Sequence, residues 1–424
     1  MKRLFGILLF LVVAAGGAYG FVVTQREASY RRFVGQGDAA LARDDSFAAI
    51  EAFSVAISLK ADSMAAHLKR GEAYRRRGEY EMAVGDLRRA AALDPLAVHP
   101  RELLGDVHYR VGIEDGRAAP VRFARAVERY SESAALDDRS ARLQYKLGLA
   151  AYRAGRVKTS IGALQKAIEL DPRFAEAHYV LGLCLRMAQR PEEAIRSLER
   201  AVALGPALLP AREELADLYG AVRRLESRLA HLEALAALQP IAARERSQAV
   251  AHATMGNMDR AVAQLARAAQ RYPDDRETYV TLGRLWLQRA AAGGRVELGK
   301  ALEALQTAVA GDSTSEALTL LGRAQLLAGD VARAESTLQQ ATQRFPVEAD
   351  AFLHLADAAG RRGHTASAHR ALLDYAALVP NERFDSRLLA RLAEAHMHVG
   401  DHDAARRAIA AALDKDPALR RLRQ

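Results

Sequence analysis

Histidines near the C-terminus form the densest group of side chains that could do chemistry. The group consists of His364, His369, His396, His398, His402, Asp401 and Asp403. A transition metal would need two or three imidazoles on one side of a helix or turn. Two residues apart on a helix, His396 and His398 would point to different faces, and Gly400 would interrupt the helix before His402. The spacing therefore predicts solvated or turn-lining histidines and no metal site.

No catalytic motif accompanies these histidines. The sequence contains no glycine-rich phosphate loop, no GxSxG turn and no HExxH motif. Cys184 is the only cysteine, so no internal disulfide and no cysteine-based metal site can form, and we expect it to be a small buried apolar residue. The sequence predicts that the protein is not an enzyme and uses no cofactor, no metal and no small-molecule substrate.

The charge balance narrows the class of partner. The 424 residues carry 61 Lys and Arg against 52 Asp and Glu, a net charge of +9. Spread over so long a chain, this bias is moderate and is compatible with acidic partners or an anionic membrane surface. The sequence lacks base-stacking and helix-in-groove signatures, so no nucleic-acid partner is predicted.

A pattern of small and large residues recurs about every 34 residues. One copy covers residues 64–97, with Gly71, Tyr74, Gly78, Tyr80, Ala83, Leu87, Ala90, Asp94 and Pro95 at fixed offsets. Another begins at Ala175, with Gly182, Ala194, Leu198, Ala201 and Pro206 in the matching places. Aligned on these positions, the chain contains about eleven such units.

Each recurring position has a physical reason. Small residues at repeat positions 8, 20 and 27 allow helix backbones to approach closely, and a larger residue at position 24 fills the remaining space. Glycine near position 15 can take the left-handed conformation that ends a first helix. Proline at position 32 ends a second helix, because it lacks an N–H and clashes with the preceding turn. The pattern therefore predicts pairs of helices, here named helix A and helix B of each repeat.

This pattern resembles the tetratricopeptide (TPR) repeat. The resemblance implies an all-α superhelical solenoid of about eleven helix–turn–helix repeats, which we place at residues 30–417. An uncharged run within residues 1–29 separately predicts an N-terminal signal anchor or transmembrane helix before the repeats. Extra residues are expected to lengthen the turn regions near 113–121 and 289–295. They would form either a longer turn or helix extension, or a loop that contacts a partner. Residues 418–424 are expected to form a short basic cap or tail.

The resemblance also implies that helix A lines an inner groove. Family positions 2, 5, 6, 9, 12 and 13 of helix A face the ligand, and in the second to fifth repeats they combine basic residues with tyrosines. The candidate partner-binding residues are Lys69, Arg75, Arg76, Tyr109, Arg110, Tyr145, Lys146, Tyr152, Arg153, Tyr179 and Arg186. Such a groove would suit an extended acidic segment, because Arg binds carboxylates in pairs of bonds and Tyr adds rigid apolar area. The alternative is that these are ordinary repeat residues with solvated charges. Elsewhere the predicted groove is acidic, at Glu213, Glu214, Asp217, Asp350 and Asp357.

The N-terminus bears on location. Residues 4–23 carry no charge and follow Lys2 and Arg3. Twenty helical residues span about 30 Å, the thickness of the hydrocarbon layer, which predicts a single-pass anchor in a bacterial inner membrane with the repeats on the periplasmic side. A cleaved secretory signal is the alternative.

Together these features predict a non-enzymatic, membrane-tethered scaffold or adaptor. It would mediate protein–protein interactions in the assembly of a bacterial envelope complex. The alternative is a cytoplasm-facing, membrane-anchored adaptor that regulates an envelope biosynthesis enzyme or its proteolysis.

Overall fold

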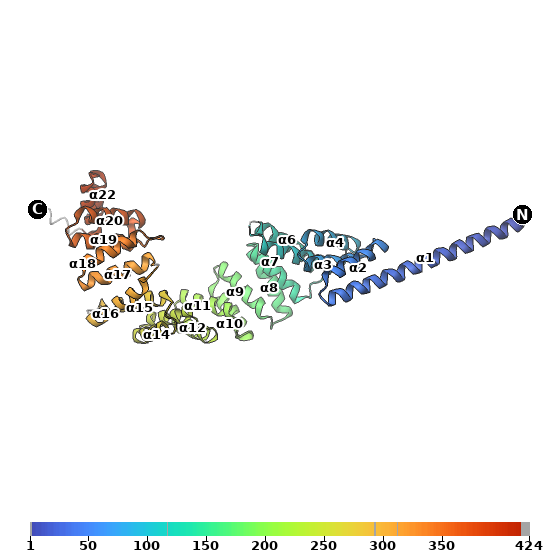
Figure 1. Cartoon of the computed structure of the whole chain (residues 1–424), viewed down its shortest axis with the longest axis horizontal. Helices are drawn as coiled ribbons and strands as arrows, with labels where there is room; N and C mark the ends of the chain where they lie inside the picture. Colours follow the sequence, from blue (N-terminus) through green and yellow to red (C-terminus); the bar gives the residue numbers. More distant parts are fainter. Residues whose placement is uncertain (1, 117, 292–293, 312, 417–424) are drawn as a thin grey trace. The chain divides into compact units, whose positions relative to one another are not determined.

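The computed structural model describes residues 2–116, 118–291, 294–311 and 313–416, with side chains from Tyr19 onward, that of residue 381 excepted. Within these residues the chain is all-helical (Figure 1). The helices are α1 (Lys2–Ala42), α2 (Ser46–Leu59), α3 (Met64–Arg76), α4 (Tyr80–Leu93), α5 (Val98–Glu114), α6 (Ala119–Leu136), α7 (Ala141–Arg153), α8 (Val157–Leu170), α9 (Ala175–Met187), α10 (Pro191–Leu204), α11 (Leu209–Ala221), α12 (Leu225–Leu238), α13 (Ala242–Thr254), α14 (Met258–Arg271), α15 (Arg276–Ala290), α16 (Arg295–Val309), α17 (Ser315–Ala328), α18 (Val331–Thr342), α19 (Ala349–Arg361), α20 (Thr365–Leu378), the 3-10 helix η1 (Asn381–Arg383), α21 (Ser386–His398) and α22 (His402–Lys415).

The predicted transmembrane helix is wrong. In the described part of the chain, no helix has both the length and the apolar character needed to cross a membrane. Residues 4–23 do not form an independent span, because they are the first part of α1, a helix of 41 residues. That helix continues through Arg26, Glu27 and Arg31, and its last part packs against α2. The predicted inner-membrane location and periplasmic placement depended on this span and are wrong with it.

The helices form two compact units, Met1–Val222 and Arg223–Gln424. The first unit contains α1 to α11 and the second contains α12 to α22. Within each unit, helix A and helix B of a repeat pack together, and helix B packs against helix A of the next repeat (Figure 1). Neighbouring A helices also touch, as α7 and α9 do in the first unit. The A helices of a unit thus share one side, which we call the helix A face.

Close packing between helix A and helix B explains the small residue at position 8. A Cβ added to Gly148 of α7 would lie 2.5 Å from Cγ of Leu164 in α8. The same conflict arises between Gly182 and Leu198. The leucines are fully buried and fill the space above each glycine. The alternation of small and large side chains therefore sets the distance between the two helices of a repeat.

The turn after helix A requires a left-handed residue. Gly155 has a φ of 72° at this position, and equivalent glycines occupy it in several repeats. In the fifth repeat the position is held by Gln189, with a φ of 58°. Glycine adopts this conformation without the Cβ clash that other residues suffer.

The extra residues of the third and eighth repeats mainly lengthen helices. Helices α5 and α6 have 17 and 18 residues, compared with 13 and 14 in α7 and α8. Helices α15 and α16 each have 15 residues. Residues 117, 292 and 293 in these segments, and the C-terminal cap or tail expected at 418–424, lie outside the described residues.

Candidate partner-binding groove

Four A helices of the first unit carry the predicted groove residues. These helices are α3, α5, α7 and α9, and local capping fixes where two of them begin. The Ser63 hydroxyl accepts a hydrogen bond from the Ala66 N–H at the start of α3, and Ser140 accepts one from Leu143 at the start of α7. Such caps satisfy N–H groups that have no partner within the helix.

Many of the predicted basic residues are paired within the protein. Lys69 lies 2.6 Å from Asp38 of α1, and Lys146 of α7 lies 2.7 Å from Glu102 of α5. A third basic residue, Arg186 of α9, lies with its guanidinium 2.7 Å from Glu214 of α11. These ion pairs join the A helices of neighbouring repeats. Their positive charge is therefore compensated before any partner binds.

Arg76 is also paired, mainly within its own helix. Its guanidinium lies 2.7 Å from Glu72 and 3.6 Å from Asp44, and it donates to the Leu41 carbonyl. The hydrogen bond with Glu72 raises the pKa of Arg76. This arginine therefore connects α3 to the turn after α1.

The pairing at Glu102 perturbs its titration. The interaction with His99, whose Nδ1 lies 3.8 Å away, lowers the pKa of Glu102 to about 2, reinforced by Lys146 and opposed by burial. The same interaction raises the pKa of His99. Glu102 is thus an ionised carboxylate held between a histidine and a lysine of the next repeat.

Two predicted arginines remain available. Arg110, one turn before the end of α5, and Arg153, the last residue of α7, are exposed, and neither forms an ion pair within the described residues. Arg75 is half-buried, and its Nε has no hydrogen-bond partner in that part of the chain. The cations of the predicted groove without an ion pair in the described chain therefore lie in the C-terminal halves of α3, α5 and α7.

The four predicted tyrosines are half-buried. The ring of Tyr109 packs 5.3 Å from that of Phe123, and the ring of Tyr145 packs 4.7 Å from that of Phe174. Tyr152 and Tyr179 pack against the apolar core of the fourth to sixth repeats. Burial raises the pKa of Tyr145 and of Tyr179, so both hydroxyls stay protonated at neutral pH. These rings offer rigid, partly apolar surface.

The helix A face becomes acidic at α11. Burial raises the pKa of Glu214, opposed by Arg186 and assisted by Asp217 and Glu213. A hollow of about 430 Å³ is lined by Arg186, Asp217 and Leu218 among others. The predicted site is thus not uniformly basic, since acidic side chains follow its last arginine.

Sequence reasoning missed the ion pairs, although a signal for them is present. Asp38 and Asp106 stand at repeat position 9, and Lys69 and Lys146 stand at position 6 of the following repeat. In the second unit Asp357 and Arg391 repeat this relation, at 2.7 Å. An acidic residue at position 9 followed by a basic residue at position 6 of the next repeat could have predicted the pairs.

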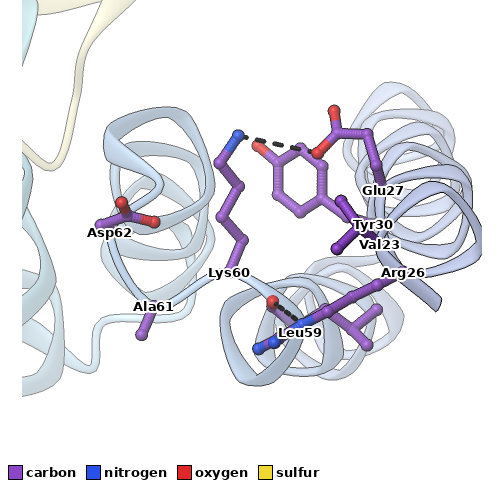
Figure 2. Close-up of a pocket in the computed structure, with 8 residues that line it drawn as sticks. All are labelled: Val23, Arg26, Glu27, Tyr30, Leu59, Lys60, Ala61 and Asp62. Atoms are coloured by element: carbon purple, nitrogen blue, oxygen red, sulfur yellow. Dashed lines mark hydrogen bonds and ion pairs between the residues drawn. The ribbon is translucent and has the colours of Figure 1, made fainter. Parts of the chain in front are cut away.

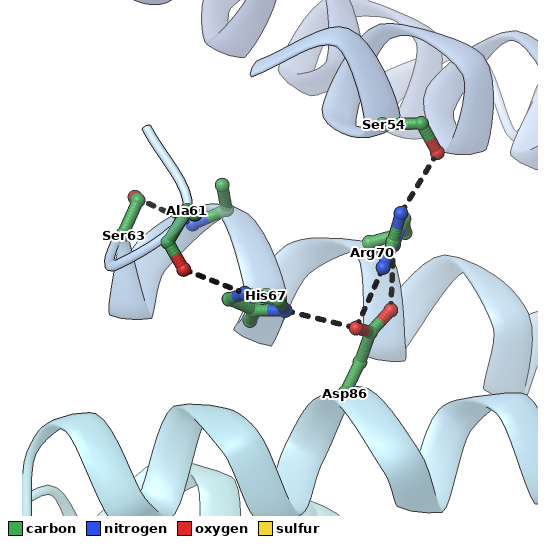
Figure 3. Close-up of polar contacts among 7 residues, drawn as sticks. Ser54, Ala61, Ser63, His67, Arg70 and Asp86 are labelled. Carbon is green, nitrogen blue, oxygen red and sulfur yellow. Dashed lines mark hydrogen bonds and ion pairs between the residues drawn. The ribbon is translucent and has the colours of Figure 1, made fainter. Parts of the chain in front are cut away.

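A buried polar network holds the second repeat together (Figure 3). Asp86 of α4 lies 2.9 Å from Nδ1 of His67 and accepts two hydrogen bonds from Arg70, both residues of α3. Arg70 also donates to the Ser54 hydroxyl of α2. All members of the network have partners, so its role is structural.

A hollow of about 320 Å³ lies between α1 and the turn after α2 (Figure 2). Arg26 donates to the Leu59 carbonyl at 2.6 Å, Lys60 lies 3.7 Å from Glu27, and the Tyr30 hydroxyl is 2.6 Å from that of Ser63. These contacts attach the last part of α1 to the repeats. They bring together no nucleophile and base, and the described residues contain no group of three or more His, Cys, Asp or Glu arranged to hold a metal.

Comparisons with known proteins place the fold. A tetratricopeptide repeat family model matches residues 34–98, 122–173, 145–208, 291–349 and 319–382, and a second such model matches 247–275. Together these segments cover more than half of the chain. No curated protein matches the sequence.

Solved structures with similar folds are distant in sequence. YrrB, described as a TPR protein with an unusual peptide-binding site, is 22% identical, with 45% of this chain and 94% of that chain covered and a TM-score of 0.40. PilF of Pseudomonas aeruginosa is 21% identical over 53% of this chain and 97% of that chain, with a TM-score of 0.39. Yeast Tom70 is 15% identical over 96% of both chains, with a TM-score of 0.42. By its repeats and by the family models that match them, the chain belongs to the tetratricopeptide repeat family.

Proposed function

We propose that the protein is a non-enzymatic scaffold that binds an extended acidic segment of a partner protein on the helix A face of its first unit. The observation that carries this proposal is that Arg110 and Arg153 are exposed, form no ion pair with any described residue, and stand next to the half-buried Tyr109 and Tyr152. Arginine can bind a carboxylate through two parallel hydrogen bonds, and tyrosine adds contact area at low entropic cost.

The ion pairs refine which predicted residues contact the partner. Lys69, Lys146 and Arg186 already pair with carboxylates, so a partner would have to displace an existing bond to use them. Arg110 and Arg153 need no such exchange. We therefore assign them the recognition of carboxylates and assign the paired residues the spacing of the A helices.

The finer assignment to an envelope complex rested on residues 4–23 as a membrane anchor. Without that anchor it has no support, and the proposal is limited to scaffolding through protein contacts. Members of the family typically bind proteins without catalysing reactions, which agrees with the absence of catalytic motifs in the sequence.

A selection from a library of displayed peptides on the full chain tests the proposal. We expect the selected peptides to be enriched in Asp and Glu and to lose binding to the double variant Arg110→Glu, Arg153→Glu. The matched control is Arg89→Glu, Arg196→Glu, which makes the same charge change at exposed positions of B helices α4 and α10. Peptides that bind the groove variant and the unmodified chain equally would refute the proposed site.

A further inference from the structure

Two histidines meet in the second unit at the last two repeats. The rings of His369 in α20 and His398 in α21 have centroids 4.2 Å apart. They line a hollow of about 420 Å³ together with Glu394 and Met397 of α21 and Ile409 of α22. Sequence reasoning compared His396 with His398 on one helix. It could not detect a neighbour contributed by the preceding repeat.

The hollow offers two imidazoles and one soft thioether as donors, and one imidazole nitrogen has no hydrogen-bond partner in the described chain. Nδ1 of His369 is buried and has no hydrogen-bond partner in the described chain. The thioether of Met397 lies 3.5 Å from Nδ1 of His402, the first residue of α22.

The number and type of donors select the metal. Structural zinc takes four donors, and the described residues hold no group of three or more His, Cys, Asp or Glu that could bind a metal. Copper(I) prefers thioether and imidazole donors and accepts two or three of them. We propose that His369, Met397 and His398 form a copper(I) site that joins α20 to α21.

Binding requires only a local change. His398 is exposed at the end of α21, so its ring can turn its edge toward His369 without moving the helix. Met397 is 51% exposed, and its sulfur would exchange the contact with Nδ1 of His402 for the bound ion. The bound ion would link the last two repeats, and a ligand that binds only the folded state stabilises it. The site is independent of the proposed helix A face in the first unit.

Anaerobic titration of the full chain with copper(I), in competition with a chromophoric copper(I) chelator, tests the site. We expect one ion per chain and reduced hydrogen exchange in α20–α22 on binding. His369→Gln and His398→Gln each remove a ligand and should weaken copper(I) binding by at least about 10- to 100-fold, the loss typical when a group that only hydrogen-bonds to a metal ligand is removed. Met397→Leu, which conserves volume, should weaken copper(I) binding through loss of the thioether.

His396→Gln is the matched control, because it removes an imidazole from the same helix that does not line the hollow. Its affinity for copper(I) should equal that of the unmodified chain. The proposal fails if the chain binds no copper(I) in the titration, or if the His369→Gln, His398→Gln double variant binds it as tightly as the unmodified chain. Equal affinity for zinc would overturn the assignment to a soft metal. Circular dichroism of each variant verifies that it is folded.

Discussion

Asp86 is the residue on which the polar network of the second repeat depends. Its side chain is buried and bonds to both His67 and Arg70. Asp86→Asn removes the negative charge and leaves Arg70 without its counterion, which we expect to cost about 3 kcal/mol of local stability. Hydrogen exchange of the α3 and α4 amides measures this loss.

Asp62→Asn provides the control for this substitution. Asp62 lies in the turn just before α3 and is exposed, so its replacement should change exchange rates little. Equal protection of α3 and α4 in Asp86→Asn and in the unmodified chain would show that the network contributes no stability.

His108 in α5 should make the third repeat sensitive to acid. Burial and the nearby Arg125 and Arg122 lower its pKa to about 4. Because the unfolded histidine titrates near 6.5, the unfolded state binds more protons between these values, and stability falls as pH drops from about 6.5 to about 4. The loss is up to about 3 kcal/mol. Exchange of α5 and α6 should follow this trend less steeply in His108→Gln, and identical slopes would contradict it.

Glu102 acts in a lower pH range. Its pKa is about 2 in the folded chain and 4.5 ordinarily, so its contribution is complete above about 4.5 and is lost as pH falls toward 2. Glu102→Gln should therefore destabilise α5 and α7 at pH 7, with a difference from the unmodified chain that shrinks below pH 4.5. A difference that stays constant down to pH 2 would contradict the ion-pair account.

Residue types on the helix A face could be predicted from the repeat register, whereas their pairing could be predicted only by comparing position 9 of one repeat with position 6 of the next. The repeat register places Lys69, Lys146, Arg110 and Arg153 on the A helices of their repeats, which are α3, α5 and α7. The packing of successive A helices decides which of these basic side chains forms an ion pair with a carboxylate. The same reasoning explains why the pair of His369 and His398 escaped detection, since the two residues belong to different repeats.

The packing of α7 on α8 is the element-scale feature most open to test. Gly148→Val would drive new atoms into Leu164, and overpacking of this kind costs about 1–3 kcal/mol. Combining it with Leu164→Ala should recover part of the loss, because the smaller partner makes room. Chemical denaturation monitored by α7 and α8 exchange measures both variants.

Gly162→Ala in α8 is a matched control with the opposite sign. Apart from the adjoining residues and the local backbone of α8 itself, no atom lies within 4 Å of the added Cβ, so alanine should stabilise the helix by about 0.5–1 kcal/mol. If Gly148→Val, like Gly162→Ala, did not lower the free energy of unfolding, the small residue at position 8 would not set the helix spacing.

The pairs of helices could be predicted from the sequence, because glycine, alanine and proline recur where helices approach closely, turn or end. The apolar segment 4–23 misled for a physical reason. Its composition resembles a membrane span, whereas in the structure it is the first part of α1, which continues through charged residues to the first repeat. The composition of residues 4–23 alone is compatible with a membrane span, but the structure shows that these residues belong to a longer helix that packs on the first repeat.

At the scale of the whole molecule, stability in a repeat array comes from contacts between neighbours. A core substitution such as Gly148→Val should therefore increase hydrogen exchange in α7, α8 and the adjoining α6 and α9. Exchange in α17–α20 of the second unit should not change. An equal increase throughout the chain would indicate one cooperative domain and contradict the nearest-neighbour description.

The central claim is that uncompensated arginines on the helix A face bind acidic segments. Its most direct test is the dissociation constant of a selected acidic peptide, measured by fluorescence anisotropy at several salt concentrations. We expect weaker binding as salt rises, a large loss of affinity in Arg110→Glu, Arg153→Glu, and unchanged affinity in Arg89→Glu, Arg196→Glu. Affinity that ignores salt, or that falls equally in both double variants, would contradict the account.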